Sequence, residues 1–308
     1  MPLPESGVAT GRWVAVHGYA LRAAERARAA AGPVTSVALL IAGCALLGVA
    51  AAGGGGAVVA IALAVVLVVA VFACCSRLAL SAMLARPVSE VEHPELYRLV
   101  RELSKDGRLP VPRLYLSPAE QPNSFTVGRG PRSAAICCTE GLLRVLDEAE
   151  LRGVLGHELA HVSGHDVLGS SLSAGLATMI TFPASPARFA RPGSARSGLG
   201  ALEHALLLVF GPVAAVIVRL AVSHEREYQA DAAGALLTGD PVALAGALRK
   251  IDAGTAELAL APDGRRVSVG HLMIASPFRP EGLARLFRTH PPAGERVRRL
   301  EALAGYRR

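Results

Sequence analysis

His157-Glu158-Leu159-Ala160-His161 places two histidines four residues apart, within a stretch (residues 151–164) that has the spacing of an amphipathic helix. Residues four apart lie on one face of a helix, so both imidazoles can reach one metal ion, with Glu158 beside the first. Zinc catalysis needs this set: neutral imidazoles, a nearby carboxylate and an open coordination position. The alternative is a surface helix with two histidines on one face, and the rest of the chain has to decide between them.

The composition places part of the chain in lipid. Of the 308 residues, 52% are hydrophobic, only 4% are aromatic and 19% are charged, which is too apolar for an ordinary soluble domain. The net charge is +7, but the arginines are scattered and form no platform with aromatic residues. We therefore interpret the basic excess as membrane-flanking charge and expect a lipid bilayer, and no nucleic acid, among the partners.

The cysteines do not form a disulfide framework. Their number is odd, two pairs of them are direct neighbours, and none has zinc-ribbon spacing. We interpret them as small apolar residues in a reducing compartment. They are Cys44, Cys74, Cys75, Cys137 and Cys138.

An uncharged apolar run follows a lead segment, residues 1–33, that we expect to remain uncleaved. No acidic or basic residue and no histidine occurs from 29 to 76, and four glycines, Gly53 to Gly56, interrupt the run midway. Each half is about 20 residues, the length that crosses a bilayer as a helix. The sequence predicts a transmembrane helical hairpin over 34–76, with spans near 34–52 and 57–75.

The charges that flank this hairpin predict its orientation. Arg22, Arg26 and Arg28 precede the first span, Arg77 and Arg86 follow the second, and the glycine-rich connection carries none. By the positive-inside rule both ends of the hairpin are cytoplasmic. An Arg- and Ala-rich, Lys-poor composition indicates a bacterial protein, so we expect a multi-pass protein of the bacterial cell membrane whose active site faces the cytoplasm.

Residues 87–308 are expected to form the enzymatic domain. Strand patterns at 113–117 and 133–138, and a loop entering a strand over 121–128, predict a small antiparallel β-sheet within a mainly α-helical fold. Helices are predicted over 93–104, 139–145 and 147–164, the last beginning at a capping box formed by Asp147 and Glu150. The two-histidine helix therefore follows the sheet directly.

A second apolar region, at about 167–222, interrupts this domain. Segments 167–187 and 205–218 are long enough for two further spans, but arginines in the connection between them, at 188–200, lie on the side that the positive-inside rule disfavours. The alternative is a re-entrant or protein-buried hairpin, and the sequence leaves both open.

A third metal ligand must come from downstream, because two histidines leave zinc one protein ligand short. The candidates are His224, Glu225, Glu227 and Asp231. Glu227 and Asp231 are four residues apart, so one can bind the metal while the other orients an imidazole from behind. The alternative is an acidic helix face that is solvated or paired with Arg226.

Several motifs, in order, resemble those of the HtpX-like integral-membrane zinc metalloproteases, relatives of the CAAX prenyl endopeptidases. Together with the N-terminal spans they cover most of residues 34–303. The matching motifs are Pro122-Asn123-Ser124-Phe125 with Gly128, Glu140-Gly141-Leu142-Leu143, His157–His161 with Asp166, Ser223 with Arg226–Asp231, and Thr289-His290-Pro291-Pro292 with Glu295-Arg296.

The resemblance implies a role for each matched site residue. His157, His161 and Glu227 would hold one zinc ion per chain, Glu158 would be the catalytic base, and Asp231 would support a ligand imidazole. Asn123 and Phe125 would lie by the edge strand that holds an extended substrate. His290 is a weaker candidate for contacting the tetrahedral intermediate, and its alternative is a helix-entry residue before two prolines.

Three departures from the family pattern are visible. His224 replaces an arginine and is a rival or auxiliary metal ligand, Ser124 replaces an alanine, and the lead segment is longer than expected. None removes a group that the chemistry needs. The sequence thus predicts a membrane-bound zinc endopeptidase for polypeptides, in particular misfolded membrane proteins, in membrane-protein quality control. A processing protease of narrow specificity and a non-catalytic membrane scaffold with a retained zinc site are the alternatives.

Overall fold

A computed structural model describes residues 23–164, 167–181, 196–261, 263, 266–279, 281, 286 and 289–305. Asp166, which the family resemblance includes, and most of the predicted 188–200 connection lie outside these residues, as does most of the lead segment. The described helices are α2 (Ala23–Ala82), α3 (Pro94–Asp106), α4 (Glu140–Val145), α5 (Glu148–Gly164), α6 (Val167–Thr181), α7 (Arg196–Ala221), α8 (His224–Thr238), α9 (Pro241–Glu257) and α10 (Ala293–Leu303), with short 3-10 turns η1 (Pro131–Ser133) and η4 (Gly270–Leu272). The strands are β1 (Arg86–Pro87), β2 (Arg113–Ser117), β3 (Ser124–Val127) and β4 (Ala135–Thr139).

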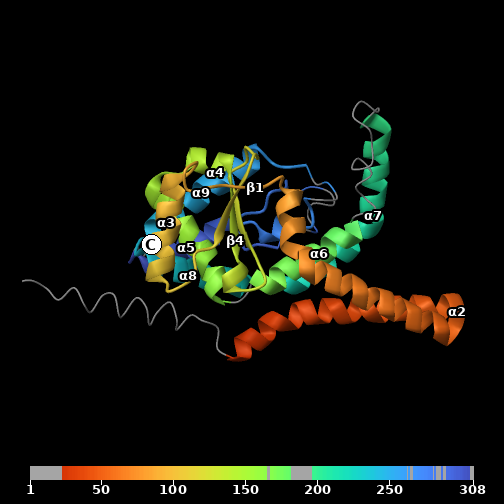
Figure 1. The fold of residues 1–308 in the computed structure, drawn as a ribbon. Coiled ribbons are helices and arrows are strands. Elements are labelled where there is room, and N and C mark those ends of the chain that lie inside the picture. Colours follow the sequence, from red (N-terminus) through yellow and green to blue (C-terminus); the bar gives the residue numbers. More distant parts are fainter. Residues whose placement is uncertain are drawn as a thin grey trace, which may run out of the picture.

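The sheet confirms the predicted strands but not their directions. Its order is β1-β2-β4-β3, and β2 pairs with β4 in parallel, whereas β3 pairs with β4 antiparallel. The expectation of a purely antiparallel sheet is therefore wrong in this respect. The reason is the strand order. β3 lies one position away from β2, and β4 occupies the position between them. Because β4 runs antiparallel to β3, it runs parallel to β2. The prediction of a mainly α fold with a small sheet is confirmed (Figure 1).

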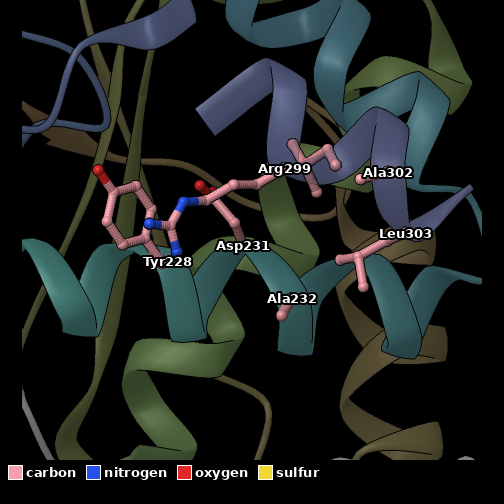
Figure 2. Close-up of a pocket in the computed structure, with 7 residues that line it drawn as sticks. Tyr228, Asp231, Ala232, Arg299, Ala302 and Leu303 are labelled. Atoms are coloured by element: carbon pink, nitrogen blue, oxygen red, sulfur yellow. The ribbon is translucent and has the colours of Figure 1, made fainter. Parts of the chain in front are cut away.

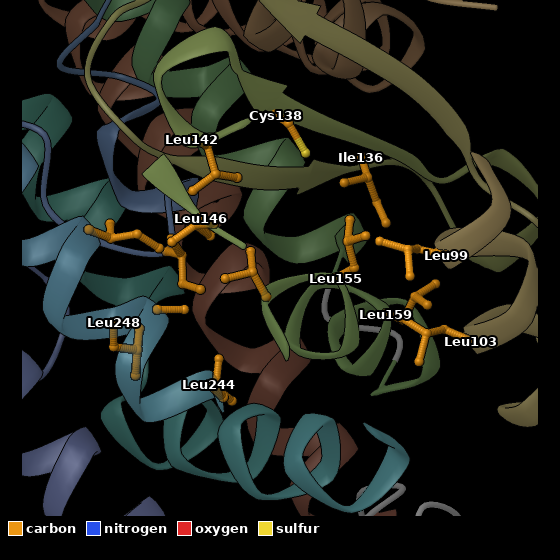
Figure 3. Close-up of a cluster of buried hydrophobic side chains, with 14 of the residues drawn as sticks. Leu99, Leu103, Ile136, Cys138, Leu142, Leu146, Leu155, Leu159, Leu244 and Leu248 are labelled. Carbon is orange, nitrogen blue, oxygen red and sulfur yellow. The ribbon is translucent and has the colours of Figure 1, made fainter. Parts of the chain in front are cut away.

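The main hydrophobic core lies between this sheet and helices α3, α5 and α9. Leu155 and Leu159 of α5 are fully buried and meet α3 at Leu99 and Leu103, as Figure 3 shows. Burying each leucine of this kind stabilises the folded protein by about 1.5–3 kcal/mol. Because the leucines take one side of α5, its histidines are presented on another.

The buried cysteines of β4 behave as the sequence indicates. Cys137 and Cys138 are free and buried, and burial raises the pKa of Cys138 to about 12. Its thiol therefore stays protonated and packs as a small apolar group.

Helix α5 begins with the predicted capping box. The backbone N–H of Glu150 donates to Oδ1 of Asp147 at 2.9 Å, and the backbone N–H of Asp147 donates to Oε2 of Glu150 at 3.0 Å. The two bonds satisfy helix-end donors that have no partner within the helix. The start of the helix that carries both histidines is thereby fixed by its own sequence.

The long apolar helix α2 is broken where the glycine run begins. Ala52 and Gly53 leave helical geometry, and Gly53 takes a φ of 62°, which suits glycine. Beyond the break the chain folds back beside itself (Figure 1). The segment Val37–Ala82 is long and apolar enough to cross a membrane, and side chains such as Leu46 and Leu47, each 72% exposed, leave its surface open to lipid.

Helix α6 connects the apolar hairpin to the sheet. A Cβ on Gly175 would come within 2.6 Å of the Val71 side chain, so α6 and α2 are in close contact. On its other side, Ser171 of α6 accepts a hydrogen bond from the backbone N–H of Gly128, just after β3, at 2.9 Å. Helix α7 packs on α6 through Ala214 and Val218, while its Val209 and Val213 are exposed.

Helices α5 and α8 touch through glycine. A Cβ on Gly234 of α8 would lie 2.6 Å from the backbone nitrogen of His157, and one on Gly156 would lie 2.9 Å from the Thr238 side chain. The helix carrying the two histidines and the helix carrying Glu227 can approach this closely only because both positions lack a side chain.

We predict that Gly234→Ala destabilises the protein by about 1–3 kcal/mol, because the new methyl group would press on the backbone of α5, which cannot yield. The matched control is Gly294→Ala in α10, where the new Cβ would meet only the end of the Arg298 side chain at 3.9 Å. Thermal unfolding of the detergent-purified proteins measures both. Equal melting temperatures for the two variants would contradict the importance of this contact.

Candidate active site

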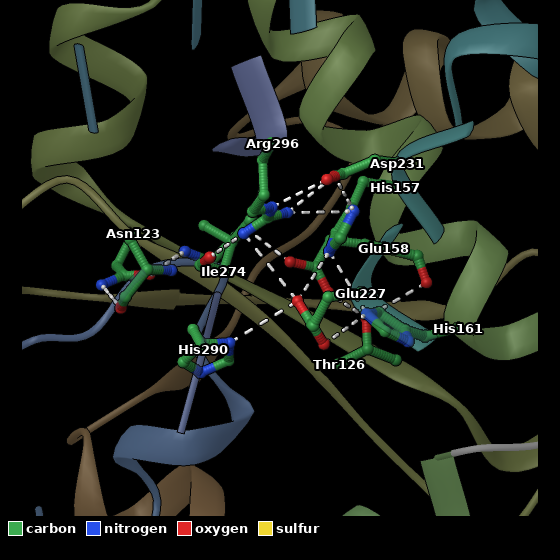
Figure 4. Close-up of polar contacts among 12 residues, drawn as sticks. Asn123, Thr126, His157, Glu158, His161, Glu227, Asp231, Ile274, His290 and Arg296 are labelled. Carbon is green, nitrogen blue, oxygen red and sulfur yellow. Dashed lines mark hydrogen bonds and ion pairs between the residues drawn. The ribbon is translucent and has the colours of Figure 1, made fainter. Parts of the chain in front are cut away.

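Three ligand atoms converge between α5 and α8. The Nε2 atoms of His157 and His161 are 3.2 Å apart, and the Glu227 carboxylate lies 3.9 Å from Nε2 of His157 and 3.7 Å from Nε2 of His161. Two nitrogens bound to one tetrahedral zinc ion at about 2.1 Å would be about 3.4 Å apart. The residues present therefore fit a zinc-sized ion, with a small approach of the Glu227 carboxylate toward the two nitrogens (Figure 4).

The burial of these side chains leaves one open side. The side chains of His157 and Glu227 are 1% and 10% exposed, whereas that of His161 is 20% exposed. An ion held here would be covered on the side of α8 and α10. It would be accessible on the side of His161. Catalytic zinc sites need such an open side for a water molecule and a substrate carbonyl.

Behind the histidines, Asp231 contacts His157, the first candidate ligand. Its Oδ1 lies 2.9 Å from Nδ1 of His157, which leaves Nε2 free for a metal. Arg296 of α10 donates two hydrogen bonds to the same carboxylate, from Nε and from Nη2, each at 2.7 Å. Burial by itself would raise the pKa of Asp231, but the Arg296 guanidinium and the His157 contact hold it below its ordinary value.

Glu227 and His290 carry polar atoms that nothing in the described chain satisfies. Oε2 of Glu227 and both ring nitrogens of His290 are buried without a hydrogen-bond partner, although Nδ1 of His290 lies 3.5 Å from that Oε2. Burial would raise the pKa of Glu227, but His290, His161 and Arg296 hold it well below its ordinary value. Buried polar atoms of this kind normally have partners, so these atoms indicate that a metal ion, water or substrate belongs here.

Glu158 is turned toward the sheet. Its carboxylate oxygens accept hydrogen bonds from the hydroxyls of Ser124 and Thr126 of β3, each at 2.6 Å. The side chain is buried. Among the described residues, two neutral hydroxyl donors thus hold the Glu158 carboxylate beside the ligand group.

The chain matches known peptidases over most of this region. Residues 90–304 match peptidase family M48. The chain belongs to that family. It is 55% identical over 238 residues to the protease HtpX homolog of Kineococcus radiotolerans, a match that covers 75% of this chain and 80% of the relative. It is 50% identical over 231 residues to the protease HtpX homolog of Paenarthrobacter aurescens, covering 74% and 79%, and 46% identical over 233 residues to that of Bifidobacterium longum, covering 74% and 76%.

These matches confirm the HtpX-like resemblance. Together with the apolar helix α2 they make the chain a membrane-bound metalloprotease of family M48. The three residues that the resemblance implies as ligands, His157, His161 and Glu227, form a group in the described chain that could hold a metal ion. His224, the rival ligand, is exposed at the start of α8 and lies outside that group.

The two substrate candidates of the M48 peptidase lie inside the fold. Asn123 and Phe125 are buried, and the Asn123 side-chain amide donates to the Ala275 carbonyl at 3.0 Å. The outer edge of β3 is itself occupied, since Ile274 donates its N–H to the Ser124 carbonyl at 2.9 Å. A direct contact of either side chain with a substrate therefore stays a prediction, and it would require residues 273–275 to move.

Sequence reasoning assigned no role to three residues of this site: Arg296, Ser124 and Thr126. Arg296 stands at the end of the Thr289–Arg296 motif, and an arginine at a fixed distance from a histidine was the available signal. The hydroxyls of Ser124 and Thr126 gave a weaker one, because alternate positions on a strand share a face. Neither signal identifies the carboxylate that the side chain contacts in the folded protein.

A shallow cavity of ≈ 250 Å³ lies between α8 and α10, on the outer side of Asp231 (Figure 2). Its edge carries a cation–π contact, with the Arg299 guanidinium 3.7 Å from the centre of the Tyr228 ring. This contact adds to the packing of α10 on α8 and so helps to fix the helix that supplies Arg296.

We predict that Arg296→Met destabilises the M48 peptidase by about 3–5 kcal/mol, because Asp231 would be left buried without a countercharge. Zinc affinity should fall by about 10–100-fold, since the orientation of His157 depends on Asp231. Thermal unfolding and metal titration measure the two effects. Arg298→Met, at an exposed arginine two residues away, is the control and should stay within about 0.5 kcal/mol of wild type; equal losses in both variants would disprove the role of Arg296.

Proposed function

We propose that this M48 peptidase is a zinc-dependent endopeptidase that hydrolyses internal peptide bonds of polypeptides. The observation that carries the proposal is the convergence of His157, His161 and Glu227 next to Glu158, at zinc-compatible separations. Zinc, when bound, supplies a Lewis acid that polarises the scissile carbonyl and makes water more acidic.

The side chains around this group divide the remaining chemistry. Glu158 takes a proton from the attacking water and delivers it to the leaving amine. His290, whose ring nitrogens have no hydrogen-bond partner in the described chain, would donate to the oxyanion that develops on the substrate carbonyl. Asp231 keeps His157 in the tautomer that binds metal.

We further propose that the substrate binds as an extended chain near β3. Asn123 would act by holding residues 273–275 at the edge of the sheet, and Phe125 by anchoring β3 from behind through the core it shares with Met273. An added strand would gain main-chain hydrogen bonds along this edge. Substrate pairing would then involve the segment that occupies it.

The cellular setting is part of the proposal. The two halves of α2 would be separate spans of a bacterial cell membrane, with the active site on the cytoplasmic side, as the flanking arginines favour. Helix α7, whose outer residues Val209 and Val213 are exposed, would add apolar surface within the bilayer, while the buried α6 would face protein. Misfolded membrane proteins are the substrates that this placement favours, in a quality-control role.

We predict that Glu158→Gln retains about one zinc per chain and lowers the cleavage rate at least 10²–10⁴-fold, because the proton acceptor is lost while the ligands stay. Glu227→Ala should lose zinc and activity together. Metal analysis and casein cleavage by detergent-purified protein measure both effects.

The matched control is His224→Ala, on the same helix but outside the ligand group, which should keep both zinc and activity. If wild type binds zinc but cuts neither casein nor a membrane-protein substrate, the scaffold or narrow-processing alternatives replace the proposal. Full zinc affinity in Glu227→Ala would refute the ligand set.

A further inference from the structure

Glu158 is held by a pair of hydroxyls that nothing in the metal group requires. Ser124 Oγ donates to Oε1 and Thr126 Oγ1 donates to Oε2, each at 2.6 Å. The two residues alternate along β3, so both hydroxyls leave the same face of the strand and meet the carboxylate side by side. Figure 4 shows Thr126 of this pair beside the ligand residues.

The geometry of these bonds restricts the carboxylate strongly. Hydrogen bonds from hydroxyls to an ionised carboxylate are short and strong at 2.5–2.7 Å. One donor on each oxygen fixes both the position of the carboxylate and the rotation of its plane. All three side chains are buried, with Ser124 at 0%, Thr126 at 6% and Glu158 at 1% exposure, so water has little access to replace either donor.

The arrangement still leaves Glu158 able to accept a proton. A carboxylate offers about four lone-pair positions, and the two hydroxyls use one on each oxygen. One position on each oxygen is therefore left to accept a proton. A carboxylate held in this way needs little reorganisation to meet a water molecule at the metal group.

We propose that Ser124 and Thr126 are positioning residues that hold the Glu158 carboxylate in its productive orientation. This inference rests on the proposed function, in which Glu158 is the proton acceptor. It gives a role to Ser124, where the family pattern has alanine, and to Thr126. The two hydroxyls act through Glu158 and do not touch the substrate.

The strand that carries these hydroxyls is held by other contacts. β3 pairs with β4 from Ser124 to Val127, and Phe125 points the other way into a core that includes Val269 and Met273. Removing the two hydroxyls therefore leaves the anchoring of the strand intact. A positioning role can be separated from a folding role for this reason.

The test compares Ser124→Ala, Thr126→Val and the double variant with wild type in full-length, zinc-loaded, detergent-purified protein. We expect the double variant to lose about 10–100-fold in kcat, with KM and zinc content close to wild type, because a misplaced catalytic group costs up to about 10²-fold. Its melting temperature should fall, because the buried Glu158 carboxylate loses two hydrogen-bond donors. The conservative variants Ser124→Thr and Thr126→Ser keep a hydroxyl and should retain kcat within about threefold of wild type.

A spectroscopic measurement gives a readout apart from activity. The measurement uses metal-free protein. The infrared carboxylate stretch that is absent from Glu158→Gln is assigned to Glu158. This stretch should shift when both hydroxyl donors are removed. An unchanged stretch or an unchanged kcat in the double variant would overturn the proposal. The proposal would also be overturned if zinc content, melting temperature and activity fell together and the conservative variants showed the same losses. That result would establish a purely structural role for the two residues. If Glu158→Gln itself cleaves at the wild-type rate, the proposed function fails, which is a separate result.

Discussion

The close contact of α5 with α8 is the constraint on which the rest of the site depends. Gly156 and Gly234 let the two helices meet backbone to backbone, with a Cβ on Gly234 excluded at 2.6 Å from the His157 nitrogen. At this distance two histidines one turn apart on α5 face a carboxylate on α8 within 4.8 Å. A wider separation would leave each ligand alone on its helix, where a glutamate and a histidine are ordinary surface residues.

The charge within this contact explains why a cation fits. Glu158, Glu227 and Asp231 bring three carboxylates into a buried region, and Arg296, the buried guanidinium among the described residues there, compensates one of them. With neutral imidazoles, two negative charges remain, which a divalent ion would neutralise. Uncompensated buried charge is costly, so the same residues that would bind the metal also make its binding favourable.

Local sequence predicted what local physics decides. The α5 helix, its Asp147–Glu150 capping box and the spacing of His157 and His161 all depend on neighbours within four residues, and the structure has them as expected. The direction of β2 relative to β4 depends on which strand position β3 takes, which no short stretch encodes. The contacts of Arg296 with Asp231 and of Ser124 with Glu158 span 65 and 34 residues, so the residue types were visible but their partners were not.

The same long-range contacts connect the apolar hairpin to the chemistry. Helix α6 packs against α2 at Gly175 and holds the end of β3 through Ser171 and Gly128, and β3 in turn holds Glu158 through Ser124 and Thr126. Only one helix and one strand therefore separate the apolar surface of α2 from the proposed proton acceptor. Because that path consists of packed helices and buried hydrogen bonds, it has little freedom to flex. Such a rigid link keeps the ligand group at a fixed position relative to the hairpin, which supports the proposal that polypeptides at a membrane are its substrates.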